Sequence, residues 1–188
     1  RLDPQQRILE VSDNLLVKGT GVAIFHLAPS LIITSIKKNG QALAHNRQGR
    51  DVYVKLGSDS QHDVTLKYKG LLPELPAARA SMNRMPLMAS EKGSYLSSSS
   101  AWHPYVEGIA TSYHLTLIVP ETQKAIVPGR LMEERTVEGF YKAVFESEVP
   151  TVGIVLIAGP FVINEKRHNK LILRTYFSPE LASLSDEY

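Results

Sequence analysis

The sequence predicts an all-β domain, built as an antiparallel saddle-shaped sheet or β-sandwich, with a possible helix start at its C-terminal end. Three observations support this fold class. Apolar and polar residues alternate with a period of two in several segments, as a strand with one buried face requires. Turn dipeptides that contain glycine separate these segments. Before Ser178, no long segment shows the 3.6-residue period of an amphipathic helix.

Six segments are predicted as strands, in chain order 31–36, 51–56, 63–69, 113–120, 154–158 and 171–177. In the third segment, Val64, Leu66 and Tyr68 share one face and polar residues take the other. Pro120 ends the fourth, because proline cannot donate to a ladder. The fifth is apolar on both faces and rich in β-branched residues, which favours a central strand covered on two sides.

Glycine and proline predict where the strands are joined. Asn39-Gly40 and Lys69-Gly70 are typical of turns between strands, and Pro128-Gly129 is a turn dipeptide. Glu133-Glu134-Arg135 follows a strand-like run and is expected at a solvated hairpin tip. Ser178-Pro179-Glu180 has the pattern of a helix N-terminus with proline at its first position.

One long segment interrupts the alternation. Leu71–Lys92 contains prolines and methionines without a clear period, so we expect an irregular stretch that wraps over a sheet edge or face.

Composition excludes several classes of protein. The chain of 188 residues with 43% apolar residues is long enough for one well-buried core. Its net charge of +2 comes from 21 basic and 19 acidic residues without strong clustering, so no nucleic-acid partner is expected. Without cysteine it forms neither a disulfide framework nor a thiolate metal site. Its longest apolar run, 153–162, is far shorter than the roughly 20 residues that cross a bilayer.

The start of the sequence also carries an expectation. It opens without methionine at a turn-like Asp3-Pro4, so we expect it to have been cut from a longer precursor with a different native N-terminus. Composition leaves the compartment open: a cytoplasmic parent and an extracytoplasmic or membrane-associated one are both compatible with it.

The residues predict no catalytic apparatus within the chain. Its six histidines are scattered, and no pair has the spacing of a zinc-peptidase helix. Ser97–Ser100 lacks a nucleophile elbow and is predicted to be a polar loop. Glu146 and Glu148 lie on one strand face without the geometry of a glycosidase pair. His114 is expected on the outward face of its strand.

The loop that contains the only tryptophan is the candidate site. Trp102, His103, Tyr105 and Glu107 lie on an irregular stretch ahead of a strand, where exposed aromatic residues commonly mark a contact. Pro104 stiffens the loop. Two interpretations stay open, because Trp102 either plugs the sandwich or contacts a ligand.

Several landmarks resemble one protein family. They are the strand order 31–41, 52–56 and 62–70, the glycine-aromatic start Gly93-Ser94-Tyr95-Leu96, the strand that ends in Val119-Pro120, and the Gly159-Pro160-Phe161 strand near the end. Together they resemble the N-terminal β-domain of aminopeptidase-N-type zinc metallopeptidases, the gluzincin peptidases.

The resemblance implies a non-catalytic domain at 1–177, with 178–188 as the start of a connection to a catalytic domain that this chain lacks. In the family, this β-domain packs on the catalytic domain and walls its substrate cleft. The zinc ion and its His-Glu-x-x-His helix are expected there, as is the parent's peptide substrate, so the fragment alone is expected to be inactive. Ser97–Gly108 departs from the family's usual motifs.

Two other classes stay open. A free-standing β-sandwich module would bind a glycan or protein ligand on Trp102 and Tyr105. A structural domain of a surface protein would need no site.

Overall fold

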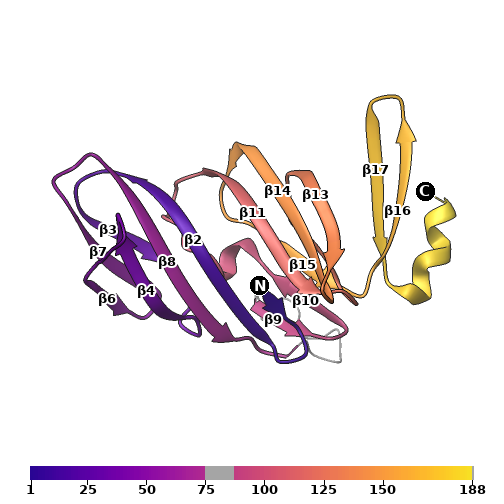
Figure 1. The fold of residues 1–188 in the computed structure, drawn as a ribbon, viewed down its shortest axis with the longest axis horizontal. Coiled ribbons are helices and arrows are strands. Elements are labelled where there is room, and N and C mark those ends of the chain that lie inside the picture. Colours follow the sequence, from indigo (N-terminus) through magenta and orange to yellow (C-terminus); the bar gives the residue numbers. More distant parts are fainter. Residues whose placement is uncertain (75–86, 188) are drawn as a thin grey trace.

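The computed structural model describes residues 1–74 and 87–187, and it confirms the all-β fold class. Within these residues the strands form five sheets, and every strand pair is antiparallel. Figure 1 shows two neighbouring groups of sheets, with a hairpin projecting at the C-terminal end.

The N-terminal half is a sandwich of two sheets. A five-stranded sheet has the order β1-β2-β8-β4-β5, and a three-stranded sheet has the order β3-β7-β6. Their strands are β1 (Leu2–Asp3), β2 (Ile8–Lys18), β3 (Gly21–His26), β4 (Ile32–Lys38), β5 (Gln41–Ala42), β6 (His45–Gln48), β7 (Asp51–Gly57) and β8 (Gln61–Leu71). The alternation predicted for 63–69 is confirmed, because Val64, Leu66 and Tyr68 are buried between polar neighbours.

Two further sheets follow. A four-stranded sheet has the order β12-β15-β10-β9, and a central three-stranded sheet has the order β11-β14-β13. Their elements are β9 (Leu87–Ser90), β10 (Gly93–Leu96), the short 3-10 helix η2 (Ser98–Ser100), β11 (Thr111–Pro120), β12 (Lys124–Ile126), β13 (Arg130–Val137), β14 (Phe140–Thr151) and β15 (Leu156–Gly159).

A hairpin and a 3-10 helix end the described chain. The hairpin pairs β16 (Val162–His168) with β17 (Leu171–Phe177), and the helix η3 spans Pro179–Glu187. The predicted helix start at Pro179 is therefore confirmed, as a 3-10 helix. Arg174 of β17 donates to Glu134 of β13 at 2.6 Å, which ties the projecting hairpin to the central sheet.

One apolar core runs through both halves. Buried residues from the sandwich, such as Leu27 and Val54, belong to the same cluster as Val119 and Leu156 of the second half. Trp102 lies within that cluster. The β-rich chain thus buries a continuous interior beneath separate sheets.

Four local predictions were wrong. Lys69-Gly70 lies inside β8, where a Cβ on Gly70 would approach the Ser30 carbonyl oxygen to 2.3 Å. The glycine therefore permits close packing instead of a turn. Glu133-Glu134-Arg135 lies within β13, because its residues pair with β14.

The other two errors concern the second half of the chain. Leu87–Ser90, expected to be irregular, forms β9; residues 75–86 of that stretch lie outside the described residues. The strand predicted over 154–158 is β15, which is central in its sheet but not covered on both faces, because Ile157 is 39% exposed.

Candidate functional site

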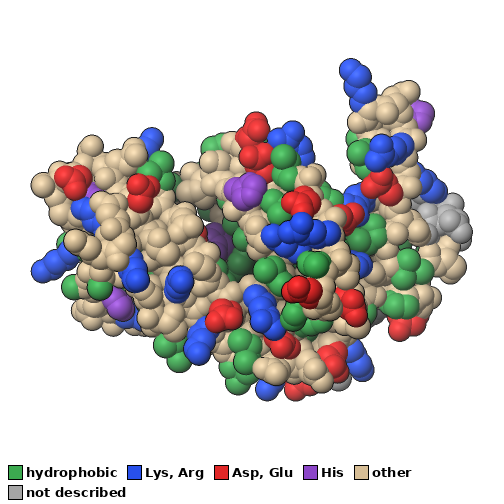
Figure 2. Space-filling model, in the orientation of Figure 1, with side chains coloured by type: hydrophobic (Ala, Val, Ile, Leu, Met, Phe, Trp, Pro, Cys, Tyr) green, Lys and Arg blue, Asp and Glu red, His purple; other side chains and the backbone are tan. Residues whose placement is uncertain are grey.

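A groove of about 870 Å³ lies between β2 and β11. Figure 2 shows it as the depression between the sandwich and the central sheet. Both strands that flank it lie at or beside a sheet edge. β11 is the outermost strand of its sheet, and β2 is covered only at its start, where the two residues of β1 pair with Ile8 and Leu9.

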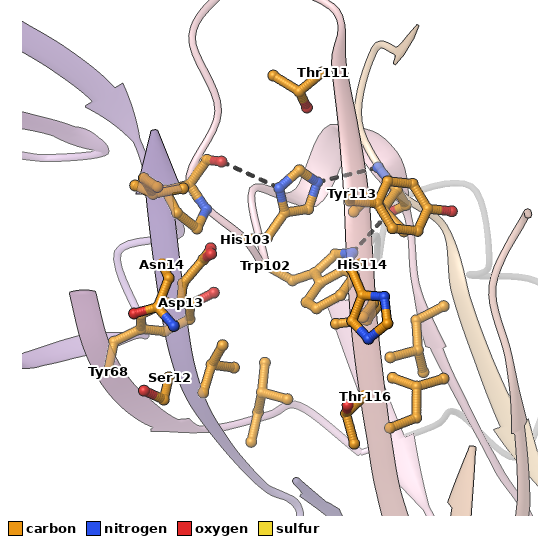
Figure 3. A pocket seen from close by; sticks show the side chains of 18 of the residues that line it. Ser12, Asp13, Asn14, Tyr68, Trp102, His103, Thr111, Tyr113, His114 and Thr116 are labelled. Atoms are coloured by element: carbon orange, nitrogen blue, oxygen red, sulfur yellow. Dashed lines mark hydrogen bonds between the residues drawn. The ribbon is translucent and has the colours of Figure 1, made fainter. Parts of the chain in front are cut away.

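Asp13 is the unusual residue of the β2 wall. It occupies the inward row of the strand with Val11 and Leu15, and Figure 3 shows it extending into the space between β2 and β11. Burial raises the pKa of Asp13 to about 6, against a smaller lowering by a backbone hydrogen bond from Asn14. No ion pair to Asp13 is found among the described residues.

Tyr68 of β8 lies beside Asp13 in the same wall. Its side chain is 1% exposed, and its hydroxyl has no hydrogen-bond partner among the described residues. Desolvation, and secondarily the charge of Asp13, raise the pKa of Tyr68 well above its usual value. A buried hydroxyl without a partner is costly, so this wall carries one unsatisfied hydroxyl beside a largely desolvated carboxyl group.

Trp102 and His103 form the floor of the groove, as Figure 3 shows. Trp102 is 2% exposed, and its indole N–H donates to the Ile154 carbonyl at 2.7 Å. His103 Nε2 accepts the Ile154 N–H at 3.0 Å, and Nδ1 lies 3.1 Å from the Pro104 carbonyl. These bonds fix a neutral imidazole with its proton on Nδ1, and desolvation lowers the pKa of His103.

Tyr113 and His114 lie on opposite faces of β11, the strand on the other side of the groove. Tyr113 faces inward and donates its hydroxyl to the Pro128 carbonyl, which ties the start of β11 to the turn between β12 and β13. His114 is exposed on the opposite face, as predicted. The predicted inward row of β11 is confirmed, because Leu117 and Val119 are buried.

The other two candidate residues lie away from the groove. Tyr105 packs against His26, with ring centroids 5.2 Å apart, and its hydroxyl accepts from Arg50. Glu107 is exposed near the end of the loop. The structure thus brings Trp102 and His103 together at the groove. It places Tyr105 beside β3 and leaves Glu107 exposed to solvent.

Asp13 and Tyr68 were not predicted as site residues. In the sequence, Tyr68 completes an apolar row and gives no sign of an unpartnered hydroxyl. Asp13 could have been found, because it is a lone carboxylate in a row whose other members are Leu9, Val11, Leu15 and Val17.

The residues do not fit a zinc ion. No group of three metal-ligating side chains occurs among residues 1–74 and 87–187, and cysteine is absent from the sequence. Within the same residues, no helix has the length and apolar character needed to cross a membrane.

The fold of the chain resembles part of several solved structures. No protein-family model matches the chain, and no curated protein matches its sequence. Solved structures do match. An M1 zinc metallopeptidase from Deinococcus radiodurans aligns with a TM-score of 0.70 at 18% identity, over 92% of this chain and 43% of that one. The chain shares its fold with M1 zinc metallopeptidases.

Two further structures agree. Aminopeptidase A of Legionella pneumophila gives a TM-score of 0.74 at 15% identity, over 98% of this chain and 24% of that one. An aminopeptidase N family protein from Idiomarina loihiensis gives a TM-score of 0.59 at 11% identity, over 99% of this chain and 33% of that one. The chain thus spans less than half the length of each of these three proteins, and the likeness extends over nearly all of the chain.

Proposed function

We propose that this chain is the non-catalytic β-domain of a zinc metallopeptidase, that it packs on a catalytic domain of the same polypeptide, and that it walls the substrate cleft there. The fold likeness carries the proposal, because it covers 92% of this chain but only 43% of the Deinococcus radiodurans enzyme. The remaining part of such an enzyme would supply the zinc site and bind the peptide substrate. In this division, 1–177 form the domain and 178–188 begin the connection.

The projecting hairpin supports a packing role. Three consecutive apolar residues of β17 are exposed, Leu171 by 56%, Ile172 by 50% and Leu173 by 46%, and Leu181 of the following helix is 50% exposed. Farther along β17, Arg174 is bonded to the central sheet. Exposed apolar side chains close together mark an interaction surface. Because this surface adjoins the C-terminal end of the described chain, a following domain is the partner that it suits.

In this proposal the Trp102–Glu107 loop is a wall and not a catalyst. Glu107 is exposed and Tyr105 is half-buried, whereas Trp102 and His103 hold the loop to Ile154. The glycan-binding alternative stays a prediction, and the burial of Trp102 does not favour it, since a stacking platform needs an open ring face.

Two measurements test the proposal. The purified chain of 188 residues, incubated with zinc and aminoacyl or peptide substrates, is expected to hydrolyse none of them; zinc-dependent turnover would overturn the non-catalytic assignment. The coding sequence after residue 188 is expected to contain a His-Glu-x-x-His helix followed by a distal glutamate. A reading frame without them would overturn the peptidase assignment.

A further inference from the structure

A second hollow lies on the three-stranded sheet β3-β7-β6. Its volume is about 390 Å³, a size typical of small-molecule sites. In Figure 1, β6 and β7 lie at the end of the molecule opposite the C-terminal hairpin. We call it the Tyr53 hollow, and its main lining residues are Val22 of β3, Tyr53 and Lys55 of β7, and His45, Asn46 and Gln48 of β6.

Tyr53 and Val22 form the apolar part of this hollow. Tyr53 lies opposite Asn46 of β6 and between the buried Val52 and Val54, so its side chain belongs to the outer face of the sheet. Val22 is 55% exposed. An aromatic ring and an aliphatic side chain therefore stand on the solvated side of the sheet, where polar residues are the rule.

The rest of the lining is polar, and none of the residues that line the hollow is acidic. Lys55 is exposed, and it has no ion pair within the part of the chain that the structure describes. The side-chain amides of Asn46 and Gln48 can each donate and accept hydrogen bonds, as can the imidazole of His45. The hollow therefore suits a ligand with one negative charge and several hydroxyl groups, because a hydroxyl also donates and accepts.

Arg47 fixes the polar wall from the inner side of the sheet. It lies on β6 between Asn46 and Gln48. Its guanidinium donates to the Leu27 and Ala28 carbonyls at 2.9 and 2.6 Å. Asn46 accepts the Arg47 N–H through its side-chain carbonyl at 2.8 Å, which leaves the NH2 group of its amide to donate to a ligand. A wall that is already ordered loses less conformational entropy when a ligand binds.

We propose that the Tyr53 hollow binds an acidic sugar, a hexuronic acid residue of a glycan, with its carboxylate at Lys55 and its hydroxyl groups at Asn46 and Gln48. The apolar face of the sugar ring lies against Tyr53, whose ring offers a large contact area. Lys55 supplies the preference for an acidic over a neutral sugar, because a charge-assisted hydrogen bond is stronger than a neutral one. The inference is independent of the proposed peptidase function, and it uses no residue of the Trp102–Glu107 loop.

Two sugars and one simple anion test the proposal. The probe is methyl β-glucuronide, and its matched control is methyl β-glucoside, which carries a hydroxymethyl group in place of the carboxylate. Each is titrated into the chain at constant ionic strength, and binding is followed by the amide NMR signals of β6 and β7, with those of β13 as the internal reference. We expect the glucoside to bind about tenfold more weakly, as the loss of one charge-assisted contact predicts. Acetate, which carries the carboxylate without the sugar, is expected to bind more weakly than the glucuronide.

Two variants separate the parts of the site. Lys55→Gln removes the charge from an exposed position and is expected to bind the glucuronide and the glucoside with equal affinity. Tyr53→Val keeps a residue that favours a strand and is expected to weaken binding of both sugars. Lys67→Gln removes an exposed lysine from β8, in the other sheet of the sandwich, and is the matched control. It is expected to bind as the unaltered chain does.

Several results would overturn the proposal. One is the absence of saturable shifts in β6 and β7, and another is equal binding of the glucuronide and the glucoside by the unaltered chain. Binding that survives Lys55→Gln undiminished would show that the charge is not recognised. Acetate that binds as tightly as the glucuronide would show that the hollow takes any carboxylate and does not recognise a sugar.

Discussion

Asp13→Asn is expected to stabilise the protein above neutral pH and to have little effect in acid. Burial raises the pKa of Asp13 from its ordinary 3.8 to about 6. Each pKa unit corresponds to about 1.36 kcal/mol, so at pH 7.5 the ionised carboxylate costs up to about 3 kcal/mol. The sign follows because the folded state holds the proton more tightly than the unfolded state does. Stability contributed by the protonated form is present below about pH 4 and is lost as the pH rises through about 6.

The assay is urea unfolding followed by the fluorescence of Trp102, the only tryptophan, between pH 3.5 and 8. The quantity to compare is the free energy of unfolding of Asp13→Asn minus that of the unaltered chain. This difference is expected to grow from near zero to about 3 kcal/mol across the interval. Asp63→Asn removes an exposed carboxylate from the outer face of the sheet and is expected to show no such rise. A difference that is constant with pH, or that falls as the pH rises, would refute the desolvation argument.

Three other substitutions probe the fold. His103→Phe removes the acceptor of a buried N–H and should lower the free energy of unfolding by about 1–3 kcal/mol, measured in urea at pH 8. Because the pKa of His103 is lowered, the unaltered chain should lose stability as the pH falls below about 6.5. The variant should lose less over the same pH range. Gly70→Ala places a Cβ 2.3 Å from the Ser30 carbonyl oxygen and should cost about 3 kcal/mol, measured in the same way; an unchanged urea midpoint would contradict it. Arg174→Met breaks the bond to Glu134 and should accelerate amide hydrogen exchange in β16 and β17 several-fold, with β8 unchanged as the internal control.

Alternation of apolar and polar residues located β7, β8 and β11 to within a few residues, because each of these strands has one buried and one solvated face. β17 was located by its run of apolar and aromatic residues. Asn39-Gly40 was correctly predicted as a turn, since both residues adopt positive φ between β4 and β5. These are local properties that the sequence carries directly.

The remaining features depend on distant residues. β2 was not predicted, because Asp13 interrupts its apolar row and only the pairing with β8 makes the strand evident. Whether Trp102 is a plug or a contact depended on the Ile154 carbonyl, which lies far along the chain. The groove itself is formed by two strands about a hundred residues apart, so no local pattern could have revealed it.

The strand pairings also set an order of assembly. β16 and β17 are joined by Asn169 and Lys170 alone, so this hairpin can close within microseconds. β2 must instead wait for β8, because Lys18 pairs with Gln61 and Ile8 with Leu71. During synthesis, the apolar row of β2 has no partner strand until β3 to β7 and then β8 have left the ribosome. The N-terminal sandwich is therefore the slow-folding part of the molecule and the part with the greatest need of protection from aggregation.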